Sequence, residues 1–209
     1  MRFVGRGVAG SREEILARVE ADPPELAWAR QVHSARVLAA MPGECGEGDA
    51  LFTRRSGLAL SIVTADCVPV LLAGPEGIAA VHAGWRGIAS GVIAAAVAAL
   101  DAGGGEGAGA GVTAWIGPAI GLCCYEVGEE VAVEVARASA PEVVVPGPAG
   151  RPHLDLPGAA WRQLTAAGVG DVRCVVRCTR CDGERLASYR REGKGAGRNL
   201  AVIWRLPNS

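Results

Sequence analysis

The chain has 209 residues, which fits one domain more readily than two, and we treat residues 1–209 as a single domain. Half of the residues are hydrophobic and 21% are charged, a composition typical of globular proteins that excludes intrinsic disorder. The formal net charge of −1 argues against a broad basic face, so we expect no nucleic-acid partner.

Seven cysteines accompany only three histidines. An odd number of cysteines excludes a scaffold in which every cysteine is paired within one chain. The N-terminal residues lack the apolar run of a signal peptide, and no uninterrupted apolar stretch is long enough to cross a bilayer. We therefore expect a cytoplasmic protein with reduced thiols and no membrane partner. In that setting, neighbouring Cys and His side chains indicate metal binding or catalysis.

The first half of the chain is predicted to consist mostly of strands. Ser11 and Glu14 form a capping-box pattern that predicts a helix over Ser11–Glu20. A strand is expected over Gln31–Val37, followed by a glycine-rich loop over Pro42–Gly48. Short apolar runs, bounded by turn residues, then predict buried strands over Leu58–Thr64, Val68–Ala73 and Gly77–Val81.

The second half mixes helices with strands. Apolar residues at three- and four-residue spacing predict a helix over Ile88–Leu100, and the Gly- and Ala-rich segment Ala102–Gly111 is interpreted as a flexible surface loop. The remaining patterns predict a strand over Val112–Ile116, a helix over Val127–Ala138, a loop over Pro141–Pro152, a helix over Pro157–Ala167, and strands over Val172–Val176 and Asn199–Leu206. Because strands and helices do not alternate strictly, we expect an α/β fold of the layered α+β kind. It would be a compact domain with a mixed central sheet flanked by helices.

Polar residues stand where three of these strands should end: Gln31-Val32-His33, Asp66-Cys67 and His82 to Gly87. If the strands are neighbours in one sheet, His33, Cys67 and His82 would give a zinc ion three protein ligands and leave its fourth position open. The spacings are too long for a local zinc motif. On spacing alone we favour the simpler interpretation, in which the histidines are separately hydrogen-bonded and Cys67 is a small buried residue.

Two basic segments suit an anionic ligand. Arg86 stands at a predicted helix start, where a guanidinium and free backbone N–H groups could bind phosphate, although surface arginines at helix ends are equally common. Ser188-Tyr189-Arg190-Arg191 precedes a glycine-rich turn with further cations, whose spacing excludes a P-loop. This segment either binds a phosphate or carboxylate or forms a solvated basic turn.

The remaining cysteines form less specific patterns. Cys174, Cys178 and Cys181 have the C-x₃-C-x₂-C spacing of some iron–sulfur enzymes, but too little chain follows them to build a barrel of that class. Cys178 and Cys181 form a C-x-x-C without a second pair, which supports a zinc site poorly. We interpret Cys174 as a core residue and Cys123-Cys124 as packing residues or a site wall.

Taken together, the motifs resemble one family. Gln31-Val32-His33, Thr64-Ala65-Asp66-Cys67-Val68-Pro69, His82-Ala83-Gly84-Trp85-Arg86-Gly87, Ile116-Gly117-Pro118-Ala119-Ile120 and Ser188-Tyr189-Arg190-Arg191 occur in this order. The set is similar to the YfiH/YlmD family, once called multicopper polyphenol oxidases or laccase-domain proteins. The resemblance covers the chain from about Gln31 to its end. It departs from the family at the front, where the N-terminal segment is shortened.

The resemblance implies a compact layered α/β fold and a metal, zinc in preference to copper, bound by His33, Cys67 and His82. It implies phosphorolysis of adenosine, inosine and methylthioadenosine, and deamination of adenosine, with purine nucleoside and phosphate as small-molecule partners. Asp66 is the candidate acid–base group, or else orients a metal-bound His. Arg86 is a candidate catalytic and phosphate-binding residue. Further substrate contacts are assigned to Gln31, Ser188, Tyr189 and Arg190. A monomer and a homodimer both stay open.

Three other functions compete with this one. A peptidoglycan-editing hydrolase acting on a nucleotide-linked muramyl precursor would use the same metal site. The old laccase label fits poorly, because multicopper oxidases need many His ligands and this chain has three. A non-enzymatic, structural zinc protein is the fourth interpretation, and it predicts that loss of His82 lowers stability without removing any turnover.

Overall fold

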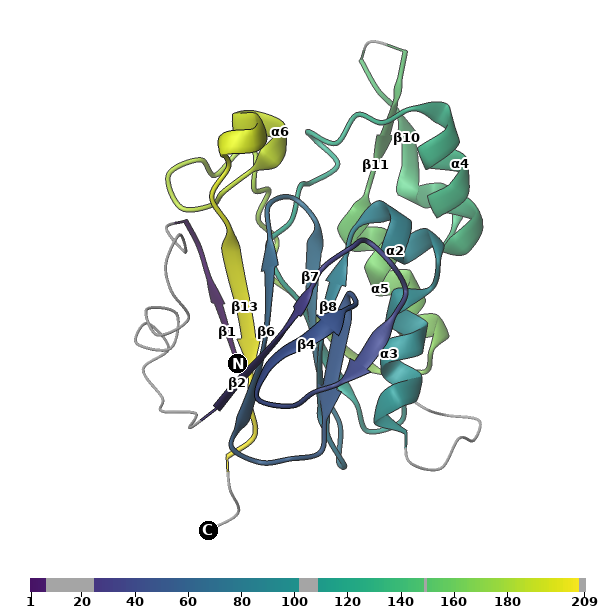
Figure 1. Ribbon diagram of the computed structural model, residues 1–209. Coiled ribbons are helices and arrows are strands. Elements are labelled where there is room, and N and C mark those ends of the chain that lie inside the picture. Colours follow the sequence, from purple (N-terminus) through teal and green to yellow (C-terminus); the bar gives the residue numbers. More distant parts are fainter. Residues whose placement is uncertain (7–24, 102–108, 149, 207–209) are drawn as a thin grey trace.

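The computed structural model describes residues 1–6, 25–101, 109–148 and 150–206. Its strands form two large sheets and a small hairpin (Figure 1). The five-stranded sheet has the order β1 (Arg2–Val4), β13 (Asn199–Ile203), β6 (Leu58–Thr64), β2 (Glu25–Arg30), β4 (Gly43–Glu47). The six-stranded sheet has the order β12 (Asp171–Cys174), β9 (Thr113–Ile116), β7 (Val68–Ala73), β8 (Ile78–Ala83), β5 (Ala50–Thr53), β3 (Val37–Ala39). Strands β10 (Val144–Pro146) and β11 (Pro152–Leu154) form the hairpin.

The two large sheets pack face to face. Alternate residues of β6, such as Leu58, Leu60 and Ile62, contact a shared apolar cluster that also includes Leu71 of β7 and Ile78 of β8. Because side chains alternate between the faces of a strand, one set of β6 residues points into this interface and the other points away from it. The interface holds the β6–β7 connection in place, and that connection carries Asp66 and Cys67.

Helices cover the other face of the six-stranded sheet (Figure 1). Val70 and Leu72 of β7 pack there against Ile88, Val92 and further apolar helix residues. The helices are α2 (Trp85–Ala89), α3 (Val92–Leu100), α4 (Glu129–Ala138) and α5 (Leu156–Ala166), with the short α6 (Tyr189–Glu192) and the 3₁₀ turns η1 (Pro141–Val143) and η2 (Gly193–Gly195). Strands β7 and β8 are therefore buried on both faces, which explains their continuous apolar sequences.

The predicted α/β class is confirmed. The strands over Leu58–Thr64 and Val68–Ala73 have the predicted bounds, and six further predicted elements appear with ends shifted by a few residues: β8, β9, α4, α5, β12 and β13. The predicted single central sheet is, in the structure, two packed sheets, because a strand pattern does not reveal which sheet a strand joins. Within the described residues, no helix has the length and apolar character needed to cross a membrane.

Several predicted elements are wrong. Gln31–Val37 is a loop up to its last residue, because the backbone N–H groups of Val32, His33 and Ser34 bind the side chain of Asp49 instead of a neighbouring strand. The predicted loop Pro42–Gly48 contains β4, and the predicted loop Pro141–Pro152 contains η1 and β10.

One further predicted element is a broken helix, and two predicted segments lie wholly or partly outside the described residues. The predicted helix Ile88–Leu100 is split into α2 and α3 around Gly91, which has a φ of 81°. The predicted helix Ser11–Glu20, and residues 102–108 of the predicted Gly- and Ala-rich loop, lie outside the described residues.

Candidate functional site

His33, Cys67 and His82 lie together. One potential ligand atom from each side chain falls within 4.8 Å of the others, and Cys67 Sγ is 3.8 Å from His33 Nε2. His33 belongs to the loop after β2, Cys67 directly precedes β7, and His82 lies in β8. The antiparallel pairing of β7 with β8 sets Pro69 opposite His82, which brings the start of β7 next to that histidine. The sheet edge thus joins residues that are far apart in the sequence.

Asp49 organises two of these three residues. Its carboxylate accepts hydrogen bonds from the backbone N–H groups of His33 (2.9 Å) and Ser34 (2.6 Å), and it lies 2.8 Å from Nδ1 of His82. Burial alone would raise the pKa of Asp49. The hydrogen bonds from His82, Ser34 and His33 outweigh burial and hold that pKa well below its usual range. The loop that carries His33 is therefore wrapped around a buried, charged carboxylate.

The same contacts shift the pKa values of His82 and Cys67. Burial alone would lower the pKa of His82, but Asp49 and Cys67 outweigh it and raise that pKa to about 9. Burial would raise the pKa of Cys67, yet hydrogen bonds with His33 and His82 lower it to about 6. Because Asp49 holds Nδ1 of His82, the ring nitrogen left to face a ligand is Nε2.

The three side chains fit a metal ion. Two imidazole nitrogens and one thiolate suit a tetrahedral zinc with an open fourth position, and a His₂Cys set also occurs in copper sites. A side chain at Gly84 would obstruct them, since a Cβ there would stand 2.9 Å from His33 Cδ2 and 3.1 Å from Cys67 Sγ. The third histidine of the chain, His153, is not part of this group. Its Nδ1 atom lies 2.8 Å from the carbonyl oxygen of Leu122. The group is a candidate centre for one metal.

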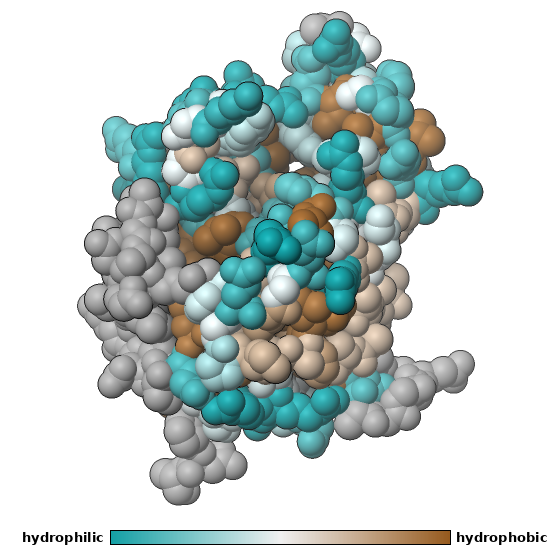
Figure 2. All heavy atoms as spheres, in the orientation of Figure 1, coloured by the Kyte–Doolittle hydropathy of each residue, from teal (hydrophilic) through white to brown (hydrophobic). Residues whose placement is uncertain are grey.

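A cavity of about 530 Å³ opens beside this group. It lies between the β6–β7 connection, the loop before α4, and α6. Figure 2 shows the surface hollowed between the part that carries α6 and the part that carries α4 and the β10–β11 hairpin. The cavity is lined by Ala29, Gln31, His33, Val63, Thr64, Ala65, Asp66, Cys67, His82, Tyr125, Tyr189, Arg190 and Arg198. Its size is that of a small-molecule site.

Asp66 lines the cavity but does not orient a histidine. Its oxygens accept hydrogen bonds from the hydroxyl of Thr179 and from the backbone N–H of Arg190, both at 2.6 Å. Asp49, and not Asp66, is therefore the carboxylate that holds the candidate ligand His82, and the alternative role considered for Asp66 does not match these contacts. The φ of Asp66 is 92°, a region that non-glycine residues occupy at a cost and mainly at functional sites.

The other predicted site residues divide into two groups. Gln31, Tyr189 and Arg190 line the cavity, and the Gln31 amide also pairs with the backbone of Val63 at 2.7 and 2.9 Å. Ser188 is fully buried and accepts a hydrogen bond from the N–H of Arg191, so the structure gives it the place of a helix cap. Arg86 is exposed, lies outside the cavity wall, and stacks 4.3 Å over the ring of Trp85.

Sequence reasoning missed Asp49 and Tyr125, and it named Arg198 only as one of the cations in the turn that follows Ser188–Arg191. Asp49 precedes β5 without any motif of its own, and Arg198 follows a glycine-rich turn. Tyr125 comes directly after the cysteine pair Cys123-Cys124; its ring lies 5.1 Å from the Arg190 guanidinium, and burial raises its pKa to about 12. Tyr125 stands just before a predicted helix and Arg198 belongs to a cluster of cations, but Asp49 lies beside no predicted strand or helix, so the sequence held no signal for it.

The chain is similar to several named proteins. Purine nucleoside phosphorylase ORF3 of Streptomyces griseus is 39% identical over 210 residues, which cover 94% of this chain and 81% of that protein. Adenosine deaminase RL5, from an unknown prokaryotic organism, is 36% identical over 220 residues, covering 95% of this chain and 82% of that protein. The crystal structure of YlmD from Geobacillus stearothermophilus matches with a TM-score of 0.84 at 28% identity, over 98% of this chain and 85% of that one.

The sequence also matches a family model over residues 5–206, which is almost the whole chain. The YlmD structure shares this chain's fold. The other two proteins are 39% and 36% identical to this chain, and their names describe enzymes that act on purine nucleosides. The chain thus belongs to the family described as multi-copper polyphenol oxidoreductase laccase, the YfiH/YlmD proteins that its motifs resemble.

Proposed function

We propose that the protein is a zinc-dependent purine nucleoside phosphorylase that also deaminates adenosine and cleaves methylthioadenosine. The observation that carries the proposal is the convergence of His33, Cys67 and His82 beside a cavity of about 530 Å³. The names of two similar proteins, a purine nucleoside phosphorylase and an adenosine deaminase, support the same substrate class.

The cavity wall supplies the contacts that a nucleoside and a phosphate need. Arg190 and Arg198 lie on it, and guanidinium groups bind phosphate oxygens in a fixed fork geometry. The rings of Tyr125 and Tyr189 offer apolar faces for a purine base. We assign phosphate binding to these two arginines in preference to Arg86, because Arg86 stacks on Trp85 outside the wall.

The side chains around the candidate metal centre position the reacting groups. His33, Cys67 and His82 would hold the zinc, which supplies a Lewis acid when bound. Asp49 keeps the His82 ring in one orientation. Asp66 keeps the backbone of Arg190 on the wall by accepting its N–H, and we therefore regard Asp66 as a positioning residue. In phosphorolysis a phosphate oxygen bonds to C1′ of the ribose, the bond from C1′ to the base breaks, and the base takes up a proton.

Product analysis tests this function. The protein is incubated with adenosine, inosine or methylthioadenosine, each with and without phosphate, and the products are identified by mass spectrometry. We expect a free base only when phosphate is present, together with ribose 1-phosphate from adenosine or inosine and 5-methylthioribose 1-phosphate from methylthioadenosine. Inosine should form from adenosine with or without phosphate. A parallel incubation with a muramyl-serine nucleotide tests the hydrolase alternative. Release of serine there, with all nucleosides intact, would overturn the proposal.

A further inference from the structure

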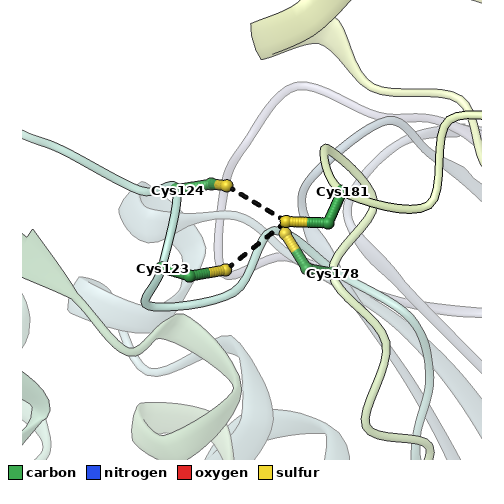
Figure 3. A group of neighbouring side chains, drawn as sticks. All are labelled: Cys123, Cys124, Cys178 and Cys181. Atoms are coloured by element: carbon green, nitrogen blue, oxygen red, sulfur yellow. Dashed lines mark hydrogen bonds between the residues drawn. The ribbon is translucent and has the colours of Figure 1, made fainter.

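Four other cysteines meet at a second place in the fold. Cys123 and Cys124 lie in the loop between β9 and α4, and Cys178 and Cys181 lie in the loop between β12 and α6. Their sulfur atoms all fall within 4.8 Å of one another, and they face each other where the two loops meet (Figure 3). The C-x-x-C of the sequence therefore has a second pair after all. Cys174, interpreted from the sequence as a core residue, is exposed and lies outside the group.

The sheet explains why these loops meet. Strands β9 and β12 are parallel neighbours, with Ile116 in register with Cys174, so both loops leave the same edge of the sheet. The pairing continues beyond the strands, where the N–H of Thr179 donates to the carbonyl of Ala119 at 3.0 Å. The N–H of Gly121 then donates to Cys178 Sγ at 3.3 Å, which is the kind of contact that supports a metal-bound thiolate.

We propose that Cys123, Cys124, Cys178 and Cys181 bind a single structural Zn²⁺ ion. Four thiolates around one zinc at about 2.3 Å form a tetrahedron whose edges measure about 3.8 Å. The Sγ atom of Cys181 lies 3.7 Å from that of Cys123 and 3.4 Å from that of Cys124. An iron–sulfur cluster places its thiolates on different iron atoms and so needs a wider group.

Disulfide bonds fit these four residues less well. All seven cysteines of the chain are free in the structure. Cys181 lies close to both Cys123 and Cys124, and it could form a disulfide with only one of them. A single ion uses all four sulfur atoms at once and closes its coordination sphere, which is the pattern of structural and not catalytic zinc.

This second site would fasten two walls of the cavity together. Tyr125 follows Cys124 directly and lines the cavity. Thr179 stands between Cys178 and Cys181, and its hydroxyl donates to Asp66 at 2.6 Å. The carbonyl of Thr179 also accepts a hydrogen bond from the guanidinium of Arg191 at 2.7 Å. A zinc ion here would thus hold both loops in the positions that place Tyr125 and α6.

Metal analysis of the full chain tests the proposal, independently of catalysis. The protein is reconstituted with zinc under reducing conditions, dialysed, and analysed for zinc per chain and by X-ray absorption spectroscopy. We expect the Cys67→Ser variant to keep one zinc with four sulfur ligands at about 2.3 Å. The Cys178→Ser/Cys181→Ser variant should lose that zinc. Cys174→Ser is the matched control, because it removes a neighbouring thiol outside the group and should keep the zinc content of the wild type.

The wild type provides a readout that does not depend on any variant's folding. With both sites loaded, its X-ray absorption spectrum should give an average of about 2.5 sulfur ligands per zinc, because one site offers four thiolates and the other offers one. With only the four-cysteine site loaded, the average should be four. An average of one sulfur ligand per zinc would overturn the proposal. It would also be overturned by iron in place of zinc, or by a disulfide between Cys124 and Cys181 in unreduced native protein.

Discussion

Asp49 and His82 form a buried pair in which a carboxylate oxygen lies 2.8 Å from Nδ1 of the imidazole, with the Asp49 side chain fully shielded from solvent. The same carboxylate accepts hydrogen bonds from backbone N–H groups of the loop that carries His33. One side chain thereby fixes both the ring orientation of one candidate ligand and the position of another. Carboxylate–histidine pairs of this kind typically orient metal ligands.

Asp49→Asn should therefore weaken metal binding. The amide keeps the shape of the carboxylate but loses its charge, and loss of such a partner typically costs about 10–100-fold in metal affinity. Zinc affinity measured by competition with a chelator checks this. Asp171→Asn, at a half-exposed carboxylate paired with Arg173, is the control and should leave the affinity unchanged. An Asp49→Asn protein with wild-type affinity would exclude this role.

The same residue predicts how acid destabilises the metal-free protein. Because the folded-state pKa of Asp49 lies below its unfolded value of about 4, its contribution to stability is fully present above pH 4. That contribution is lost as the pH falls through the folded-state pKa. Thermal unfolding of wild type and Asp49→Asn from pH 7 to pH 3 checks this. The difference in Tm between them should shrink below about pH 4, and a constant difference would contradict the assignment.

Gly84→Ala should damage the metal centre by steric contact alone. The φ of Gly84 is −74°, so alanine fits the backbone, but its Cβ would stand 2.9 Å from His33 and 3.1 Å from Cys67. We expect a folded protein whose zinc affinity falls on the order of tenfold or more. Gly170→Ala is the matched control, since no atom lies within 4 Å of a Cβ there. Equal affinities for the two variants would show that the close approach at Gly84 is unimportant.

Thr179→Val should loosen the cavity wall to which we assign phosphate binding. Valine keeps the volume but removes the hydroxyl that donates to Asp66, leaving a buried carboxylate oxygen without one of its partners, at a cost of about 1–3 kcal/mol. Because Asp66 also holds Arg190, the KM for phosphate should rise more than kcat falls. Steady-state kinetics together with thermal unfolding check this. Thr165→Val, whose hydroxyl donates to a backbone carbonyl within α5, serves as the control, and a loss of stability with an unchanged KM would leave Thr179 a purely structural residue.

Arg198→Ala and Arg86→Ala should differ in their effect on phosphate. Arg198 lines the cavity and Arg86 does not, so the first change should raise the KM for phosphate by about tenfold or more and the second should leave it unchanged. Initial rates at varied phosphate concentration measure both. The reverse result would return the phosphate site to Arg86.

The elements buried on both faces were the most predictable. Leu58–Thr64 and Val68–Ala73 are short apolar runs between turn residues, and they form β6 and β7 with the predicted bounds. The strand predicted over Gln31–Val37 is wrong because the backbone of this segment donates hydrogen bonds to the side chain of Asp49. That contact joins residues far apart in the sequence, and no local pattern predicts it. How strands are shared between two sheets likewise depends on long-range pairing.

The candidate site was predictable only in part. The sequence motifs pointed to His33, Cys67 and His82, and the structure brings them together. Asp49 was missed because its importance lies entirely in contacts made after folding. The four-cysteine group was missed for a similar reason: the pairing of β9 with β12 joins Cys123 and Cys124 to the C-x-x-C, and sequence spacing alone leaves them apart.

The central claim is that His33, Cys67 and His82 hold a metal needed for nucleoside phosphorolysis. Its most direct test measures activity and metal content on the same samples, before chelation, after it, and after zinc is returned. We predict that phosphorolysis of adenosine disappears with the metal and returns with zinc in the wild type and in Cys45→Ser, but not in Cys67→Ser. A fully active preparation holding less than about half a metal ion per chain would contradict the claim.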